Sequence, residues 1–308
     1  MISAARSSMG WKHFLPWIFL SVMGISWGLS FSLGKIAVES GGAPLGIALF
    51  QAMFAATILF AITLFRRKPI LELREHLGLI TIIGILGSVL PGSLFYYSAS
   101  HVQAGVLSIT IALIPLMTYG ASVPLGMEKF SSKRFAGLLC GIVAIALIAL
   151  PQNSLPDRAA IPWILLACVS SLCYTGENLV LAAQSVTRIG PIRMSMGMNV
   201  MASLMLFPIA SWNDSLLVFS YPFGSMEYSV IGLSLISVVA YTMFVMSVGM
   251  FGPVFASQTG YIVTLSGVFW GMYIFGETHS YWVWLALGLM MIGLALVTPR
   301  TSEQADPL

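Results

Sequence analysis

Charged residues are scarce in this sequence. Only 8% of its 308 residues are charged, whereas 58% are hydrophobic, and acidic side chains number just 11. A soluble domain carries about 25% charged residues, so this chain could not cover a surface exposed to water. We therefore expect a polytopic membrane protein in contact with the lipid bilayer.

Cysteine is also scarce, and the familiar ligand motifs are missing. The three cysteines, Cys140, Cys168 and Cys173, all fall in apolar segments without metal-ligand spacing. They indicate neither a disulfide framework nor a zinc site. No Walker motif occurs, so we expect no direct use of ATP, no cofactor and no metal. The basic residues lie in short loops between apolar runs, which argues against a nucleic-acid partner.

Long apolar runs, in contrast, fill the chain. A spanning helix needs about 20 mostly apolar residues, and the first run is too long for the core of a cleavable signal peptide. The connections between runs leave no room for a soluble domain, and the ends form polar tails, 1–13 and 299–308. Ten segments are predicted to span: 14–38, 44–65, 77–97, 103–125, 133–151, 161–184, 191–210, 228–248, 253–276 and 280–298.

The orientation of these segments follows from the lysines and arginines in the loops. With the N-terminus inside, all the basic residues fall on the cytoplasmic side except Arg158, in an outer loop, and Lys35, within the first segment. Positively charged loops stay in the cytoplasm. We therefore expect both termini to be cytoplasmic, with ten helices between them.

An internal repeat is also visible. Residues 103–150 can be laid on 252–299 without a gap, so that Ser108 meets Ser257 and Glu128 meets Glu277. Two repeats of five spans, 14–151 and 161–298, must run in opposite directions through the membrane. Inverted repeats of this kind are typical of transporters, with the substrate site near the midplane. The predicted fold is thus an all-α membrane protein with ten transmembrane helices in two inverted five-helix repeats.

Short motifs recur in a fixed order over both halves. The first half has Trp27-Gly28, Lys35, Pro44, Phe95-Tyr96-Tyr97-Ser98-Ala99, Pro115, Glu128, Gly137 and Ala144, and the second has Gly252-Pro253, Phe275-Gly276-Glu277 and Gly293. In these residues the chain resembles the drug/metabolite transporter superfamily, of the EamA type. The resemblance implies export of metabolites across a bacterial inner membrane. One departure is Gln51, where such families often carry an arginine, and it argues against anionic substrates.

The candidate site is organised around Glu177, the one acidic residue well inside an apolar segment. Burying such a charge costs about 3 kcal/mol on insertion scales, so it is expected to be functional. It shares one helical stripe with Ser170, Cys173 and Gln184. Its apolar setting favours the protonated form and suits proton exchange. The alternative is a structural, neutral glutamic acid bonded to a neighbouring helix.

Counting 1.5 Å per residue along each segment places other polar residues at similar depths. Lys35 comes out about 20 Å from Glu177 in height, so we expect it to snorkel to the outer interface or to serve function without pairing. The substrate- or proton-binding set predicted from depth and resemblance is Glu177, Tyr174, Asn178, Gln258, Tyr261, Tyr241, Asn199, Gln51, Lys35 and Tyr97.

Small residues and prolines predict local features of four segments. A stripe of small residues in 253–276 predicts close helix packing rather than substrate contact; it consists of Ser257, Gly260, Thr264, Gly267 and Gly271. Pro91, Pro115 and Pro208 are expected to kink their helices. Glu128 and Glu277 end matching segments, as interfacial structural residues or as gate contacts.

The functional prediction is a secondary active transporter of small organic metabolites, driven by protons or by exchange. It would export amino-acid-like compounds by alternating access, as a multi-pass inner-membrane monomer or homodimer. An intramembrane enzyme would need paired catalytic residues at membrane depth, yet Asp157 and Asp214 fall in outer loops. A non-transporting sensor or scaffold is the other alternative.

Overall fold

A computed structural model describes residues 3–69, 71–183, 189–251 and 258–297. Within these ranges the chain is helical and has no strand. The elements, in chain order, are α1 (Ser3–Glu39), α2 (Pro44–Phe65), η1 (Leu71–His76), α3 (Leu77–Gly84), η2 (Ile85–Val89), α4 (Leu90–Ala99), α5 (Ala104–Ile111), α6 (Leu113–Ser122), α7 (Ser132–Ala149), η3 (Arg158–Ala160), α8 (Ile161–Ala183), α9 (Pro191–Trp212), α10 (Ser225–Phe251), α12 (Thr259–Phe275) and α13 (Tyr281–Val297).

Most of these helices are built to cross a membrane. Eight helical segments are long and apolar enough by length and composition; two of them, Leu73–Ala99 and Ala104–Ser122, each combine two or more of the short elements. Two shorter apolar helices, α12 and α13, have 17 residues each. The predicted start of the ninth segment, at 253, and Gln184 and Ser257 of the predicted stripes lie outside the described residues. The large apolar side chains on the outside of the bundle, such as Leu64 and Phe269, suit contact with lipid.

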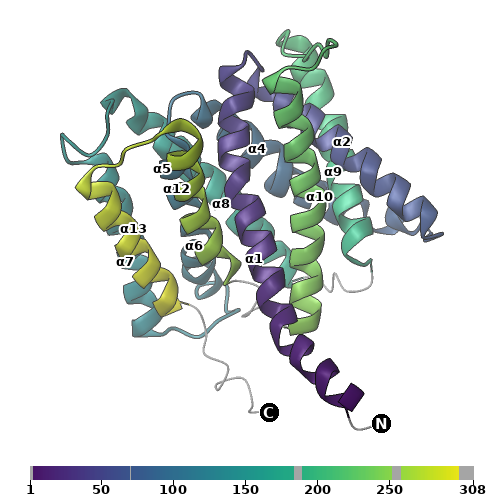
Figure 1. The fold of residues 1–308 in the computed structure, drawn as a ribbon, viewed down its shortest axis with the longest axis horizontal. Coiled ribbons are helices and arrows are strands. Elements are labelled where there is room, and N and C mark those ends of the chain that lie inside the picture. Colours follow the sequence, from purple (N-terminus) through teal and green to yellow (C-terminus); the bar gives the residue numbers. More distant parts are fainter. Residues whose placement is uncertain (1–2, 70, 184–188, 252–257, 298–308) are drawn as a thin grey trace.

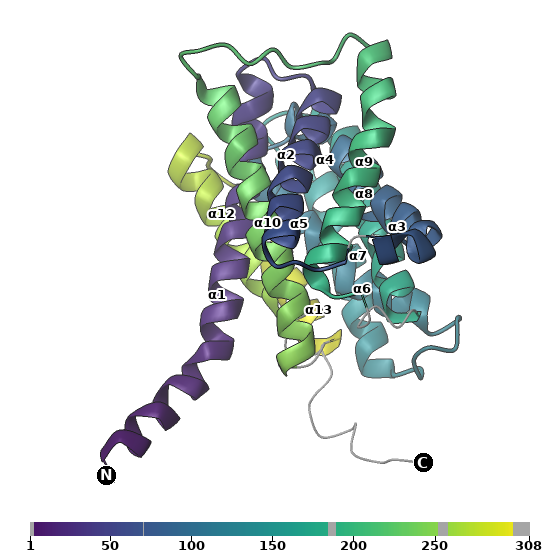
Figure 2. The same cartoon turned by 90° about the vertical axis from the view of Figure 1, so that its right-hand side faces the viewer.

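The helices form a single bundle whose two long edges differ (Figures 1 and 2). At one edge α7 lies along α13, and at the other α2 lies along α9. Between them, α1 packs on α10 and α12, whereas α8 packs on α4, α5 and α6. The first and sixth predicted spans thus make corresponding contacts with helices of the opposite half. We call the end of the bundle where α1 ends, at Glu39, the distal end; it is uppermost in Figure 1.

Two of the three predicted proline effects coincide with breaks in helices. Pro91 follows directly after the π-helical turn η2, and Pro115 lies one turn after the break between α5 and α6 at Ala112. Proline removes a backbone donor and clashes with the preceding turn, which explains both irregularities. The α-helix α9, however, continues through Pro208.

The α7–α13 edge depends on a pair of glycines in contact. A Cβ atom added at Gly137 would lie 2.7 Å from the carbonyl oxygen of Gly293, and one added at Gly293 would lie 2.8 Å from that of Gly137. Either approach is shorter than van der Waals contact. The two backbones therefore touch, as small residues permit in membrane helices.

We expect Gly293→Ala to lower the free energy of unfolding by about 1–3 kcal/mol, because the added methyl group forces α7 and α13 apart. The matched control is Gly288→Ala in the same helix, where an added Cβ meets nothing within 4 Å. Thermal melting of both variants in detergent checks this. Equal melting temperatures would contradict the glycine contact.

Candidate functional site

The carboxyl group of Glu177 is buried inside the bundle. The side chain is 5% exposed, and α8 places it about 7 Å from the midpoint of the helix, toward its C-terminal end. Its Oε1 atom accepts a hydrogen bond of 3.3 Å from the Tyr241 hydroxyl of α10. The acid is therefore held between helices and does not face lipid.

The other side of the Glu177 carboxyl touches the backbone of the first half. A Cβ atom added at Gly87 would overlap all three atoms of the carboxyl group, so a larger residue there would have to displace it. Gly87 lies in the π-helical turn η2. Such turns widen a helix locally and are frequent at functional sites. The irregular turn before Pro91 thus makes the space that the acid occupies.

A line of polar side chains continues from Glu177 across the bundle. Tyr174, one turn earlier in α8, lies near Glu177 and near Tyr96 of α4. Tyr96 is 2% exposed, and its hydroxyl donates a hydrogen bond to Oε1 of Gln51 in α2. We call these five residues, Gln51, Tyr96, Tyr174, Glu177 and Tyr241, the polar line. It joins α2 and α4 of the first half to α8 and α10 of the second.

The small polar residues of α8 serve a different purpose. The Ser170 hydroxyl donates to the carbonyl of Pro91 at 3.0 Å, and Ser171 donates to that of Thr110 at 2.9 Å. Thr175 reaches Ile114 at 3.4 Å. These carbonyls lie beside the two helix breaks, where backbone groups lose partners in the regular helix. The serines and the threonine therefore tie α8 to the irregular helices around the acid.

Several residues of the predicted set lie elsewhere. Lys35 donates to the carbonyl of Val102 at 3.2 Å and pairs with Glu39 at 3.2 Å, both at the distal end. Asn199 is 3% exposed, and its amide donates to the carbonyl of Ser195 in its own helix. The Tyr97 side chain is 39% exposed.

The other three predicted residues lie on α8 and at the start of α12. Asn178 follows Glu177 in α8 and is partly buried. Gln258 and Tyr261 lie at the start of α12, which packs on α1 and α5, whereas the line runs through α2, α4, α8 and α10.

The sequence prediction missed two residues of the site, Tyr96 and Gly87. Tyr96 and Tyr97 are adjacent, and the apolar pattern of α4 does not tell which of them faces inward. Gly87 has no side chain, so a search for polar side chains could not find it. The signal that could have found it is a glycine four residues before a proline in a spanning segment, a pattern that favours an irregular turn.

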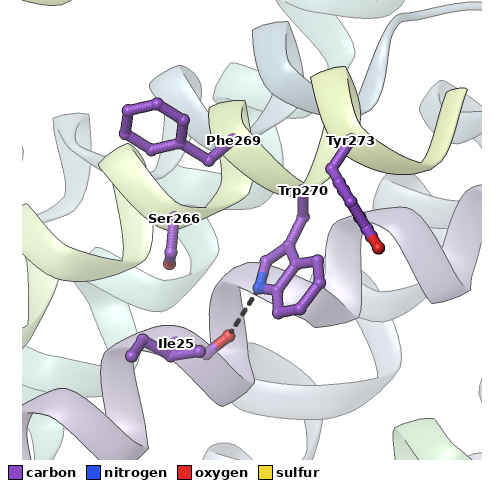
Figure 3. Close-up of a pocket in the computed structure, with 5 residues that line it drawn as sticks. All are labelled: Ile25, Ser266, Phe269, Trp270 and Tyr273. Carbon is purple, nitrogen blue, oxygen red and sulfur yellow. Dashed lines mark hydrogen bonds between the residues drawn. The ribbon is translucent and has the colours of Figure 1, made fainter. Parts of the chain in front are cut away.

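A surface groove of about 540 Å³ lies apart from this site, between α1 and α12. Figure 3 shows Trp270 reaching across it, where its indole nitrogen donates to the carbonyl of Ile25 at 3.2 Å. Phe269 and Tyr273 are 62% and 83% exposed on its rim. Aromatic rings exposed on a membrane helix suit lipid contact, so this groove is not part of the polar line.

We expect Gly87→Ala to lower the free energy of unfolding by about 1–3 kcal/mol, because the methyl group displaces the Glu177 carboxyl. In a Glu177→Ala background the same change should cost little, with a coupling energy of about 1 kcal/mol or more. The control is Gly92→Ala, where the added Cβ lies 3.9 Å from the Cβ of Ala48. Thermal melting of the four variants of the cycle measures the coupling, and strictly additive effects would refute the contact.

This chain is similar to one family and to two individual proteins that are named as transporters. The profile of the EamA-like transporter family matches the chain twice, over residues 15–150 and 161–298. The chain is similar to the uncharacterized inner membrane transporter YedA of Escherichia coli K12, at 26% identity over 94% of this chain and 93% of YedA. It is 22% identical to the S-adenosylmethionine/S-adenosylhomocysteine transporter of Chlamydia trachomatis serovar L2, over 88% of this chain and 85% of that protein.

A solved crystal structure has the same fold. It aligns with a TM-score of 0.62 over 91% of this chain and 96% of the other, at 16% sequence identity. The apolar helices, the doubled family match and the inner-membrane relative together identify the protein: the chain is a multi-pass inner-membrane protein that belongs to the EamA-like transporter family.

Proposed function

We propose that the protein is a secondary active transporter that exports small organic metabolites by alternating access, driven by protons or by exchange. The observation that supports this most directly is the polar line, which joins helices of both halves at a buried carboxyl group. Buried ionisable residues in membrane proteins mark substrate and proton pathways. A site shared between two repeats suits a carrier whose halves move relative to each other.

Glu177 is the group through which coupling would act. Its carboxyl can hold a proton, or it can hold a cationic group of the substrate, but it cannot hold both. The Tyr241 hydroxyl, at 3.3 Å, supports the ionised form when the proton leaves. Release of one ligand and binding of the other would therefore be linked at a single pair of oxygens.

The substrate class follows from the chemistry of the line. The carboxyl group offers a partner for a positive charge. The three tyrosine rings offer faces for an apolar or aromatic part, and their hydroxyls and the one amide offer hydrogen bonds. Gln51 leaves the line without a cation, which disfavours anions. We infer a cationic or zwitterionic metabolite with an aromatic part. Amino acids fit this class, as does S-adenosylmethionine, which the Chlamydia relative is named for.

An enzyme or a sensor is the alternative function. For an enzyme, the aspartates Asp157 and Asp214 would have to act together at membrane depth. Asp157 instead caps η3 by accepting a hydrogen bond from the Ala159 amide at 2.9 Å, and Asp214 lies in the turn after α9. Neither belongs to the polar line, so a carrier is the better proposal.

Transport in proteoliposomes tests the function. We expect counterflow of at least one member of a panel of aromatic amino acids, S-adenosylmethionine and S-adenosylhomocysteine, with a rate that depends on pH. Glu177→Gln should lower the rate about tenfold or more and remove the pH dependence, because it cannot ionise. Tyr241→Phe should lower the rate less, because it removes only one hydrogen bond.

The control is Tyr228→Phe in the same helix as Tyr241, where the side chain is 64% exposed. It should transport like the wild type. If Glu177→Gln transports at an undiminished rate and keeps the pH dependence of the wild type, the acid has no part in coupling. If folded wild-type protein moves no compound of the panel, the proposed function with this substrate class is wrong.

A further inference from the structure

The carboxyl group of Glu277 is bound to the opposite half of the chain at the distal end. Its Oε1 accepts a hydrogen bond from the Ala104 amide at 2.7 Å, and its Oε2 accepts one from the Gly105 amide at 2.9 Å. These partners lie 173 and 172 residues away along the chain. Both amides belong to the first turn of α5, whose dipole also favours a negative charge.

The local backbone delivers Glu277 to this position. Gly276 ends α12 in the left-handed conformation, with φ 63°, which turns the chain sharply toward α5. Glu277 is 7% exposed, so the carboxyl is enclosed. Charge-assisted hydrogen bonds are stronger than neutral ones. The two bonds therefore join the halves firmly at this end of the bundle.

Below these bonds α5 and α12 are in direct contact. A Cβ atom added at Gly271 would lie 2.9 Å from the Gly105 amide nitrogen, and one added at Gly267 would overlap the side chain of Ser108. Ser108 also donates a hydrogen bond of 3.1 Å to the carbonyl of Thr264. Three residues of the small-residue stripe predicted from sequence, Thr264, Gly267 and Gly271, thus bring the two helices together, whereas Gly260 faces Leu294 of α13.

Two other polar residues near Glu277 do not replace the Ala104 and Gly105 amides as partners of its carboxyl group. The His279 side chain is buried, although the residue as a whole is partly exposed, and its Nε2 lies 3.7 Å from Oε2 of Glu277. Burial lowers the pKa of His279, although the nearby Glu277 opposes this, so the imidazole is neutral at pH 7. From the other side, Lys35 of α1 holds the carbonyl of Val102, in the turn that leads into α5.

The equivalent acid of the first half is in a different situation. Glu128 aligns with Glu277 in the repeat, yet it is 44% exposed and accepts a hydrogen bond from Arg134 at 2.7 Å. Its partner is thus six residues away in its own half. Two matching acids are therefore unequal: one is enclosed and joins the halves, and the other is open to solvent.

We propose that Glu277 is a latch that closes the distal end of the transport path by holding the first turn of α5. This inference rests on the proposed function, because alternating access requires that one end opens while the other is closed. Release of the two amides would let α5 and α12 separate and would open the path at the distal end. Glu277 would act through α5 and would not contact the substrate.

Cysteine accessibility tests the latch. Ser108→Cys, in the full-length chain with Cys140, Cys168 and Cys173 replaced by serine, places a thiol at a position that is 0% exposed. Intact cells are treated with a membrane-impermeant maleimide. Labelling should be slow in this background and about tenfold faster when Glu277→Gln is added, because the amide side chain has only one acceptor and no charge.

Glu128→Gln is the matched control, since it makes the same change at the repeat-equivalent acid. It should leave the labelling rate unchanged. An equal increase in both variants would mean general loosening and would overturn the proposal. An unchanged rate in Glu277→Gln would overturn it as well.

A second variant removes the donor in place of the acceptor, in case Glu277→Gln fails to fold. Ala104→Pro deletes one of the two amide protons at the first helical position, where proline is well tolerated. Gln103, before it, has φ −59° and ψ 140°, the conformation that a residue before proline prefers. Ala104→Pro should also speed labelling about tenfold, and an unchanged rate would contradict the latch.

The two proposals fail in different ways. If the function is wrong, the wild type transports no compound of the panel, whatever the labelling rates are. If the latch is wrong, the wild type transports, and the labelling of Ser108→Cys does not respond to Glu277→Gln or Ala104→Pro.

Discussion

Inside a bilayer no water is available, so every polar group must find its partner within the protein. Much of this structure follows from that constraint. The carbonyls beside the two helix breaks accept hydrogen bonds from Ser170, Ser171 and Thr175. The Glu177 carboxyl accepts one from Tyr241. The polar residues of α8 therefore do two things at once. They satisfy irregular backbone of the first half, and they hold one acid between the halves.

Glycine is the second condition for the same arrangement. Gly87 allows the carboxyl of Glu177 to lie against the backbone, Gly137 and Gly293 bring α7 and α13 together, and Gly271 leaves room for Glu277. At each of these places a single methyl group would have to displace a helix or a carboxyl. Close packing in this bundle and the placement of its acids thus depend on the absence of a side chain, which hydropathy does not report.

The two buried acids that join the halves differ in their partners. Glu277 is bound by two backbone amides at a helix end, and Glu177 by one tyrosine hydroxyl. Two amide hydrogens hold a carboxyl group more firmly than one hydroxyl hydrogen does. The same side chain can therefore close the bundle in one place and suit proton or substrate exchange in another.

The sequence by itself determined the class of the protein, because hydropathy and charge are properties of composition and of long segments. It also singled out Glu177 and placed Tyr174 and Tyr241 at a similar depth, since depth can be counted along a helix. Gln51 was singled out by the family resemblance. Only the tertiary structure decided which side of each helix faces which neighbour. It decided that Tyr96, and not Tyr97, faces inward. It also decided that Gly87 contacts the Glu177 carboxyl and that Glu277 binds the first turn of α5. Such contacts depend on the rotation and approach of helices far apart in the chain, and in uniformly apolar segments the periodicity that would reveal rotation is weak.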